Sequence, residues 1–253
     1  MLRLRARPIL IAVLVVSFAA PLFAADGAVI ARPQAAPPCI VVGFVGGFVR
    51  HNNPNQGPVQ LAHRIQSAVA KSAYVQVFEN RHRKTAYKTI LSLLDLNHDG
   101  VLSAEEKTRA RIILFGHSWG ASAVVLLARE LNREGIPVLL TAQVDSVAKP
   151  WQNDRVIPEN VAAAVNFYQP HGLIHGRPQI AAADASKTQV LGNFRFDYRA
   201  EPVKCERTSW FDRTFTPSHM QSDCDIHLWS QIENLVHQRL QPEPGAIAEI
   251  PMP

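Results

Sequence analysis

Short apolar segments alternate with helix-like segments along the first half of the chain, and this alternation is the feature that most limits the fold. The predicted strands are 39–43, 74–78, 111–115 and 138–144, and the predicted helices between them are 59–71, 85–94 and 119–133. Strands that are each followed by a helix form parallel sheets with helices on both faces. We therefore expect an α/β fold with a parallel sheet, in one compact domain over residues 39–240.

The second half of the chain is less regular. Residues 161–167 are predicted to form another strand, although an alanine-rich helix is an alternative there. Residues 169–223 are expected to be irregular with a few short strands, and an amphipathic helix is predicted over 226–240. The remaining residues, 241–253, are expected to be a loose tail.

Composition supports one well-filled core. The chain has 253 residues, of which 47% are hydrophobic and 19% are charged, values that exclude a disordered or collagen-like protein. The net charge of +5 arises largely from residues 1–24, which hold three basic residues and no acid. Because the rest of the chain has a net charge of only +2, the charge does not favour a nucleic-acid partner.

The first 24 residues have the pattern of an export signal. Three arginines precede an apolar run over residues 9–23, and a proline and small residues follow before Asp26. This order predicts a signal peptide over 1–24, with an uncleaved membrane anchor as the alternative, and then a flexible segment over 25–38. The mature protein is expected to be periplasmic or secreted, without a stable membrane anchor.

An exported chain meets an oxidising compartment, where cysteines pair. Cys205 and Cys224 lie in one loop-rich stretch and are predicted to form a disulfide, with two free thiols as the alternative. Cys39 begins an apolar strand and is expected to remain a buried thiol.

The most specific motif is the sequence GHSWG at 116–120. It follows the predicted strand 111–115 directly and opens an apolar helix. A serine on such a tight strand-to-helix turn exposes its hydroxyl in a cleft, and the helix N-terminus favours the negative charge that develops during acyl transfer. Ser118 is therefore the candidate nucleophile.

With this motif in this context, the chain resembles the α/β-hydrolase superfamily, especially its lipases and esterases, and it shows no obvious lid. The resemblance implies the order Ser, Asp, His along the chain. It also implies an oxyanion hole formed by the backbone N–H of Trp119 and by one from the glycine turn VGFVGG at 42–47. Phe44 is the first candidate for that second donor and Val45 the next.

The acid and the base follow from position. Asp145 ends the strand that comes after the nucleophile helix, so we expect it at the same edge of the sheet as Ser118; Asp184 and Asp197 are the alternatives. In the α/β-hydrolase superfamily the base usually lies just before the last helix, so the resemblance implies His219 as the base, with His227 as the main alternative. Three other histidines after Asp145 are less favoured as the base: His171, His175 and His237. His117, which precedes the serine, is expected to be structural.

Residues 95–106, DLNHDGVLSAEE, resemble the calcium loop of EF-hand proteins. The resemblance implies oxygen ligands at alternating positions and a glycine, Gly100, at the sharp turn. The predicted ligands of a structural Ca²⁺ are Asp95, Asn97, Asp99, Val101 (through its carbonyl), Ser103 and Glu106. No second loop of this kind is found, and a turn that binds no metal is the alternative.

Together these features predict an exported serine hydrolase that cleaves carboxylic esters of small molecules or lipids through an acyl-enzyme, without an organic cofactor. A serine peptidase or acyltransferase with the same triad is the alternative among enzymes. A non-catalytic calcium-binding module on a hydrolase fold is the alternative outside them. The basic run RHRK at 81–84 suggests attraction of an anionic substrate, but a solvated helix face is the favoured interpretation.

Overall fold

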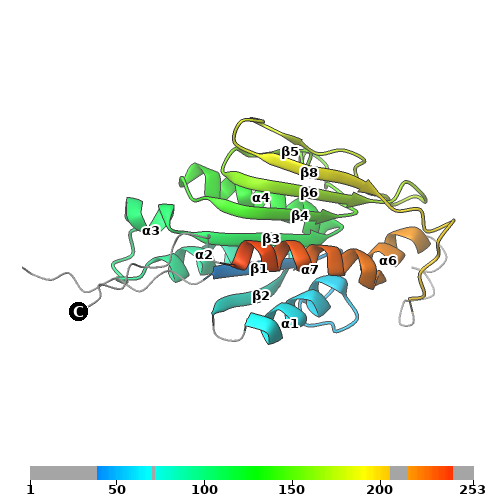
Figure 1. Ribbon diagram of the computed structural model, residues 1–253, viewed down its shortest axis with the longest axis horizontal. Coiled ribbons are helices and arrows are strands. Elements are labelled where there is room, and N and C mark those ends of the chain that lie inside the picture. The colour runs from blue at the N-terminus through cyan, green and yellow to red at the C-terminus, as the bar shows by residue number, and fades with distance from the viewer. Residues whose placement is uncertain (1–38, 70–71, 206–215, 242–253) are drawn as a thin grey trace, which may run out of the picture. The chain divides into compact units, whose positions relative to one another are not determined.

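A six-stranded parallel sheet forms the centre of the protein in the computed structural model (Figure 1). The structure describes residues 39–69, 72–205 and 216–241. The chain divides into two units, Met1–Gln34 and Ala35–Pro253, and all the described residues belong to the second. The predicted signal peptide and flexible segment lie outside the described residues, as does the predicted tail beyond residue 241.

The strands follow the predicted alternation, and the prediction of a parallel-sheet α/β fold is confirmed. The sheet has the order β2-β1-β3-β4-β6-β8, with parallel pairing throughout. Its strands are β1 (Cys39–Val45), β2 (Ala73–Glu79), β3 (Arg111–His117), β4 (Val138–Val144), β6 (Val161–Tyr168) and β8 (Gln189–Arg195). A separate two-stranded sheet pairs β5 (Val156–Ile157) with β7 (Ala181–Ala182).

Helices cover both faces of the sheet. One face packs against α2 (Arg83–Leu94) and α4 (Trp119–Arg133), and the other against α1 (Gly57–Val69) and α7 (Ile226–Leu240). The described part also contains η1 (Asn80–His82), α3 (Ala104–Thr108) and α6 (Pro217–Cys224). None of the described helices has the length and apolar character needed to cross a bilayer.

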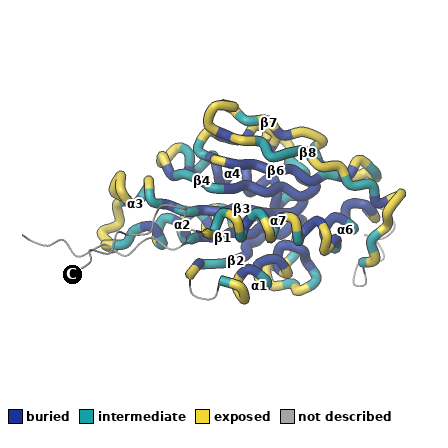
Figure 2. The backbone as a smooth tube through the Cα atoms, in the orientation of Figure 1, coloured by how far each residue is buried: buried dark blue, intermediate teal, exposed yellow. Residues whose placement is uncertain are grey.

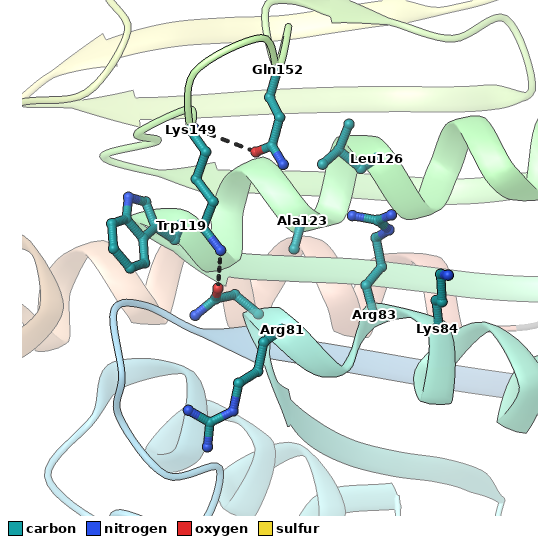
Figure 3. Close-up of a pocket in the computed structure, with 9 residues that line it drawn as sticks. Arg81, Arg83, Lys84, Trp119, Ala123, Leu126, Lys149 and Gln152 are labelled. Carbon is teal, nitrogen blue, oxygen red and sulfur yellow. Dashed lines mark hydrogen bonds between the residues drawn. The ribbon is translucent and has the colours of Figure 1, made fainter.

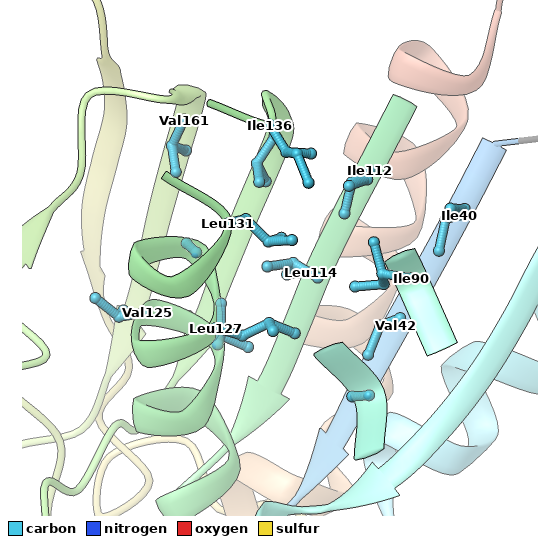
Figure 4. Close-up of a cluster of buried hydrophobic side chains, with 14 of the residues drawn as sticks. Ile40, Val42, Ile90, Ile112, Leu114, Val125, Leu127, Leu131, Ile136 and Val161 are labelled. Atoms are coloured by element: carbon cyan, nitrogen blue, oxygen red, sulfur yellow. The ribbon is translucent and has the colours of Figure 1, made fainter. Parts of the chain in front are cut away.

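Alternation along each strand divides the core between the two faces. Ile40 and Val42 of β1 belong to the cluster under α2 and α4, together with Leu114 of β3 (Figure 4), whereas Val41 packs on the α1/α7 side. The central strands are buried along most of their length, and exposure increases at the edge strand β8 (Figure 2). Because the central strands are buried on both faces, their sequences have to be continuously apolar, and this is the pattern from which they were predicted.

The region 169–223 is more regular than expected. A few short strands were predicted there, and one of them, β8, is a seven-residue strand that extends the main sheet. The segment before the last helix was predicted to be irregular but is itself helical, as α6. Residues 161–168 form a strand, which decides against the alanine-rich helix.

All the strands run in one direction, so their carboxyl ends meet at a single edge of the sheet. Ser118 follows β3, Asp145 follows β4, and the two glycines that end the glycine turn, Gly46 and Gly47, follow β1. Ligand sites in open parallel sheets form at this edge.

Candidate active site

Ser118 stands between the last residue of β3 and the first residue of α4. Its backbone has φ 58° and ψ −126°, a region that residues with a side chain rarely adopt. The flanking glycines make the turn possible: a Cβ on Gly116 would lie 2.6 Å from the backbone of Gly120, and one on Gly120 would lie 2.3 Å from the carbonyl oxygen of Phe44. The motif thus reflects a close contact of three backbone segments.

His219 and Asp145 meet Ser118 in a hydrogen-bonded line. His219 Nε2 lies 2.9 Å from Ser118 Oγ, and His219 Nδ1 lies 2.6 Å from Asp145 Oδ2. Because a carboxylate only accepts, Nδ1 carries the proton, which leaves Nε2 to accept one from the serine hydroxyl. All three residues are buried, and they come from three different elements of the fold.

Asp145 is held by more than the imidazole. Its Oδ1 accepts backbone N–H groups of Gln169 and Gly176, and its Oδ2 also accepts the Gln169 side-chain amide at 2.9 Å. A Cβ on Gly176 would lie 2.4 Å from Asp145 Oδ1, so this approach requires glycine. These hydrogen bonds orient the carboxylate, and neither Gln169 nor Gly176 was predicted as part of the site.

A second histidine–aspartate pair lies behind the first. The His117 ring stacks on the His219 ring with centroids 4.6 Å apart, and its Nδ1 lies 3.4 Å from Asp223 Oδ1. Its Nε2 lies 3.2 Å from the carbonyl oxygen of His219, an oxygen that also accepts the Ser222 hydroxyl. His117, which directly precedes the serine, thus ties the turn that carries Ser118 to the helix that carries His219.

Burial determines the charge of this second pair. Desolvation, and then the neighbouring His219 ring, lower the pKa of His117 well below 6.5. Burial also raises the pKa of Asp223 to about 7, against the backbone N–H of Gly57, which favours its ionised form. At pH values below 7 a neutral imidazole therefore faces a carboxyl that has largely kept its proton.

The predicted oxyanion donors lie at the same edge. Trp119 is the first residue of the 15-residue helix α4, so its N–H has no acceptor within the helix. Phe44 is paired inside β1, and it is Gly46, two residues later, that packs against the serine: a Cβ there would lie 2.7 Å from Ser118 Cβ. Phe44, with Val45 next, stays a prediction for the second donor.

The alternative acids and bases lie elsewhere. His227 is exposed on α7, and His237 faces Glu233 on the same helix. Asp184 closes an exposed turn with Ser186. His171 pairs with Asp197 at 2.9 Å, and His175 contacts the Gly176 carbonyl. Within the described part, the serine is therefore in hydrogen-bond reach of His219 and of none of these.

The predicted calcium loop is closed by its own hydrogen bonds. Asp95 and Asp99 accept backbone N–H groups within the loop. Glu106 Oε1 accepts Leu96 N–H, and its Oε2 accepts both N–H and O–H of Ser103, bonds that lower the pKa of Glu106. Oxygen donors of this kind suit Ca²⁺. However, no group of three or more His, Cys, Asp or Glu side chains is arranged to hold a metal ion among the described residues, so the calcium site stays a prediction.

The structure contains the predicted Cys205–Cys224 disulfide, whose Cα atoms are 5.7 Å apart. Cys224 is the last residue of α6, so the bridge anchors the helix that carries His219. Cys39 carries a free thiol, as predicted, but it is partly exposed at the start of β1 rather than buried.

No protein-family model matches the sequence, and neither does any curated protein. Among solved structures, a cutinase-like protein from Cryptococcus sp. is 12% identical, with a TM-score of 0.42 over 82% of this chain and 97% of that one. A thermostable esterase from Pseudomonas putida is 9% identical, with a TM-score of 0.42 over 82% and 76%. The type II thioesterase BorB of the borrelidin biosynthetic cluster is 10% identical, with a TM-score of 0.41 over 83% and 96%. At these TM-scores the likeness is one of general architecture, and the function proposed next rests on the geometry of this chain.

Proposed function

We propose that this protein is a serine hydrolase that cleaves carboxylic esters with Ser118 as nucleophile, His219 as base and Asp145 as the acid that orients it. One observation carries the proposal: the hydrogen-bonded line from Asp145 through His219 to a serine with a strained backbone. Strain of this kind costs free energy and persists where the surrounding structure enforces it, often at functional sites. The resemblance to lipases and esterases favours esters over other acyl donors.

In the proposed mechanism, His219 Nε2 takes the Ser118 proton as Oγ attacks the acyl carbonyl. Asp145 holds the proton on Nδ1 and stabilises the imidazolium that forms. The N–H of Trp119 and that of Phe44 donate to the oxyanion of the tetrahedral intermediate. The imidazolium then protonates the leaving alcohol, and the acyl-enzyme is hydrolysed by a water that the same histidine activates.

We also propose that the protein is exported. The disulfide supports this, because such bonds persist in oxidising compartments. The basic and apolar pattern of residues 1–24 adds to it from the sequence side. Ca²⁺ in the 95–106 loop remains part of the proposal as a structural ion, held by the six predicted oxygen ligands. Binding requires the Glu106 carboxylate to leave the cap of α3.

The test is labelling with a fluorophosphonate probe, followed by peptide mapping, with Ser118→Ala and Ser122→Ala as variants. Ser122 is a buried serine one turn further along α4, so it is a matched control. Label on Ser118 that disappears in S118A and persists in S122A supports an activated serine. Absence of label in the folded wild-type protein would instead favour the non-catalytic calcium-binding module. A labelled protein that cleaves amides but not esters would favour the peptidase.

A further inference from the structure

A cavity of about 240 Å³ opens beside Trp119, the residue that follows the proposed nucleophile, and basic side chains line it (Figure 3). Lys149 reaches into it from the loop after β4, whereas Arg83 and Lys84 come from the start of α2. Trp119 and Asn80 also line it. The basic run at 81–84 is expected from the sequence to be a solvated helix face, but the fold places three of its members, Arg81 among them, around a cavity with a lysine from a distant segment.

The cavity and Ser118 share their supporting elements. Trp119 follows the serine directly and lines the cavity with its side chain. The Asn80 side-chain amide donates to the carbonyl oxygens of Val45 and Gly47, at 3.4 and 2.6 Å, in the turn that packs against the serine. A substrate whose carbonyl group is held at Ser118 would therefore extend one of its ends over Trp119 toward the cavity.

The charge in the cavity is only partly compensated. Arg83 forms a two-point ion pair with Glu130, at 3.2 and 3.0 Å. Lys149, in contrast, is held by neutral groups: Nζ donates to Asn80 Oδ1 at 2.9 Å and lies 4.8 Å from the centre of the Trp119 ring. Among the described residues, no carboxylate forms an ion pair with Lys149 or with Lys84.

The partners of Lys149 fix its ammonium without neutralising it. An ammonium has three N–H donors, and the amide oxygen of Asn80 uses one of them while the face of the indole ring attracts the cation. Arg81, which also lines the cavity, pairs with Glu79, and in Figure 3 its side chain points away from Lys149. What remains is a positioned positive charge with free donors beside the nucleophile. An anionic oxygen group of a bound molecule would satisfy both the charge and the donors.

We propose that this cavity recognises an anionic group, a carboxylate or a phosphate, at the end of the ester substrate distant from the scissile bond, and that Lys149 is its main contact. This inference rests on the proposed function and narrows it to negatively charged esters. Lys84 adds a second charge, and Trp119 supplies an apolar wall along which the connecting chain lies.

The experiment compares two esters of equal length, 4-nitrophenyl hexanoate and mono-4-nitrophenyl adipate, which differ in a terminal methyl or carboxylate. We expect the ratio of kcat/KM for the anionic ester to that for the neutral one to fall about 10- to 100-fold in Lys149→Met, the effect of losing a charge-assisted hydrogen bond. Lys149→Arg retains the charge and should keep most of the preference. The matched control is Lys88→Met, which removes the same charge one turn along α2, outside this cavity.

Competition distinguishes the two anionic groups: inhibition by butanoate or by propyl phosphate that weakens in K149M identifies which one the cavity prefers. Failure of both to inhibit, or an ester ratio that is equal in wild type and K149M, overturns the inference while leaving the ester hydrolase in place. Failure to hydrolyse either ester contradicts the proposed function, and with it the inference.

Discussion

Two regions of this protein match functional motifs in sequence, but their polar side chains have different kinds of hydrogen-bond partners in the structure. At the carboxyl edge of the sheet, Ser118, His219 and Asp145 come from distant segments and bond to one another. In the 95–106 loop, the acidic side chains bond to the backbone of the same loop. The difference shows that a sequence motif indicates a functional site when the fold brings its groups together. Hydrogen bonds within one loop also occur in an ordinary turn rich in Asp and Asn, so they do not indicate a site by themselves.

The largest effect on activity is expected from removing the acid that orients the base. We expect Asp145→Asn to lower kcat for ester hydrolysis by about 10⁴-fold, the effect of stabilising the wrong imidazole tautomer in a triad of this type. Steady-state kinetics with a 4-nitrophenyl ester would measure the loss. Asp184→Asn, in an exposed turn, is the control and should leave kcat unchanged. A D145N variant with full activity would mean that the hydrogen-bonded line is not the catalytic apparatus.

A smaller effect is expected from the glycine that touches Asp145. Gly176→Ala places a methyl group against the carboxylate, so the aspartate has to shift. Displacement of about 1 Å in such a site can cost about 100-fold in rate, and the crowding should lower the free energy of unfolding by about 1–3 kcal/mol. Gly135→Ala is the control, because its Cβ meets open space although φ is +71°. It should cost about 1 kcal/mol and no activity. Equal kinetics for the two variants would argue against the role assigned to Asp145.

The buried His117–Asp223 pair predicts a pH effect that appears only when the pair is broken. In the pH range below 6.5 in which folded His117 stays neutral, the unfolded chain carries a proton on His117 and none on Asp223, whereas the folded protein has the reverse, so both states bind equal numbers of protons. Asp223→Asn leaves only the lowered pKa of His117. Its free energy of unfolding should therefore fall, as the pH drops below 6.5, by about 1.4 kcal/mol per pH unit relative to wild type.

Urea denaturation at pH 5, 6 and 7 would measure this slope. His117→Asn is the complementary variant: it leaves only the raised pKa of Asp223, so its stability should fall as the pH rises from 4 toward 7. Wild-type and variant curves that run parallel would contradict the assigned protonation of the pair.

The smallest expected effect is stabilisation by calcium. If it were observed, the 95–106 loop, like the edge of the sheet, would be a functional site. If the loop binds Ca²⁺ with a Kd of about 1 mM, 10 mM Ca²⁺ should stabilise the protein by about 1.4 kcal/mol and raise Tm by roughly 4 °C. Glu106→Gln should abolish the shift, although glutamine can maintain the cap of α3. Thermal unfolding with Ca²⁺, with Mg²⁺ and with a chelator would test this. An equal shift in E106Q, or none in wild type, would mean that the loop is only a turn.

The sequence predicted those parts of the fold whose signals are local. The four strands from β1 to β4 were placed within two residues of their observed ends. For the central strands β1, β3 and β4 the reason is that a strand covered on both faces must be continuously apolar. A few short strands were predicted in 169–223, but β8 was not located among them, because this edge strand is half exposed and contains Gly192 within a mixed polar sequence. α6 was missed because PSHMQSDC lacks apolar periodicity; its proline at the first turn and the disulfide at its end are the features that fit a helix there.

The site was predictable to a similar extent. Ser118, Asp145 and His219 were identified because each occupies a characteristic position relative to a strand or the final helix. The residues that orient them were not. Gln169, Gly176 and Asp223 act through contacts that join segments 24 to 166 positions apart, and a sequence pattern does not encode such distances.

The order of these elements along the chain affects biosynthesis. Ser118 and Asp145 follow adjacent strands of the sheet, β3 and β4, and all six strands of the sheet precede α6. A chain that has emerged as far as β8 can therefore complete the sheet and the serine turn while it still lacks the imidazole. In such a nascent chain, Ser118 would be an ordinary alcohol. Under the proposed mechanism, hydrolytic activity would begin only when α6 docks and brings His219 to Ser118, so synthesis of α6 would act as the switch between an inert precursor and an enzyme.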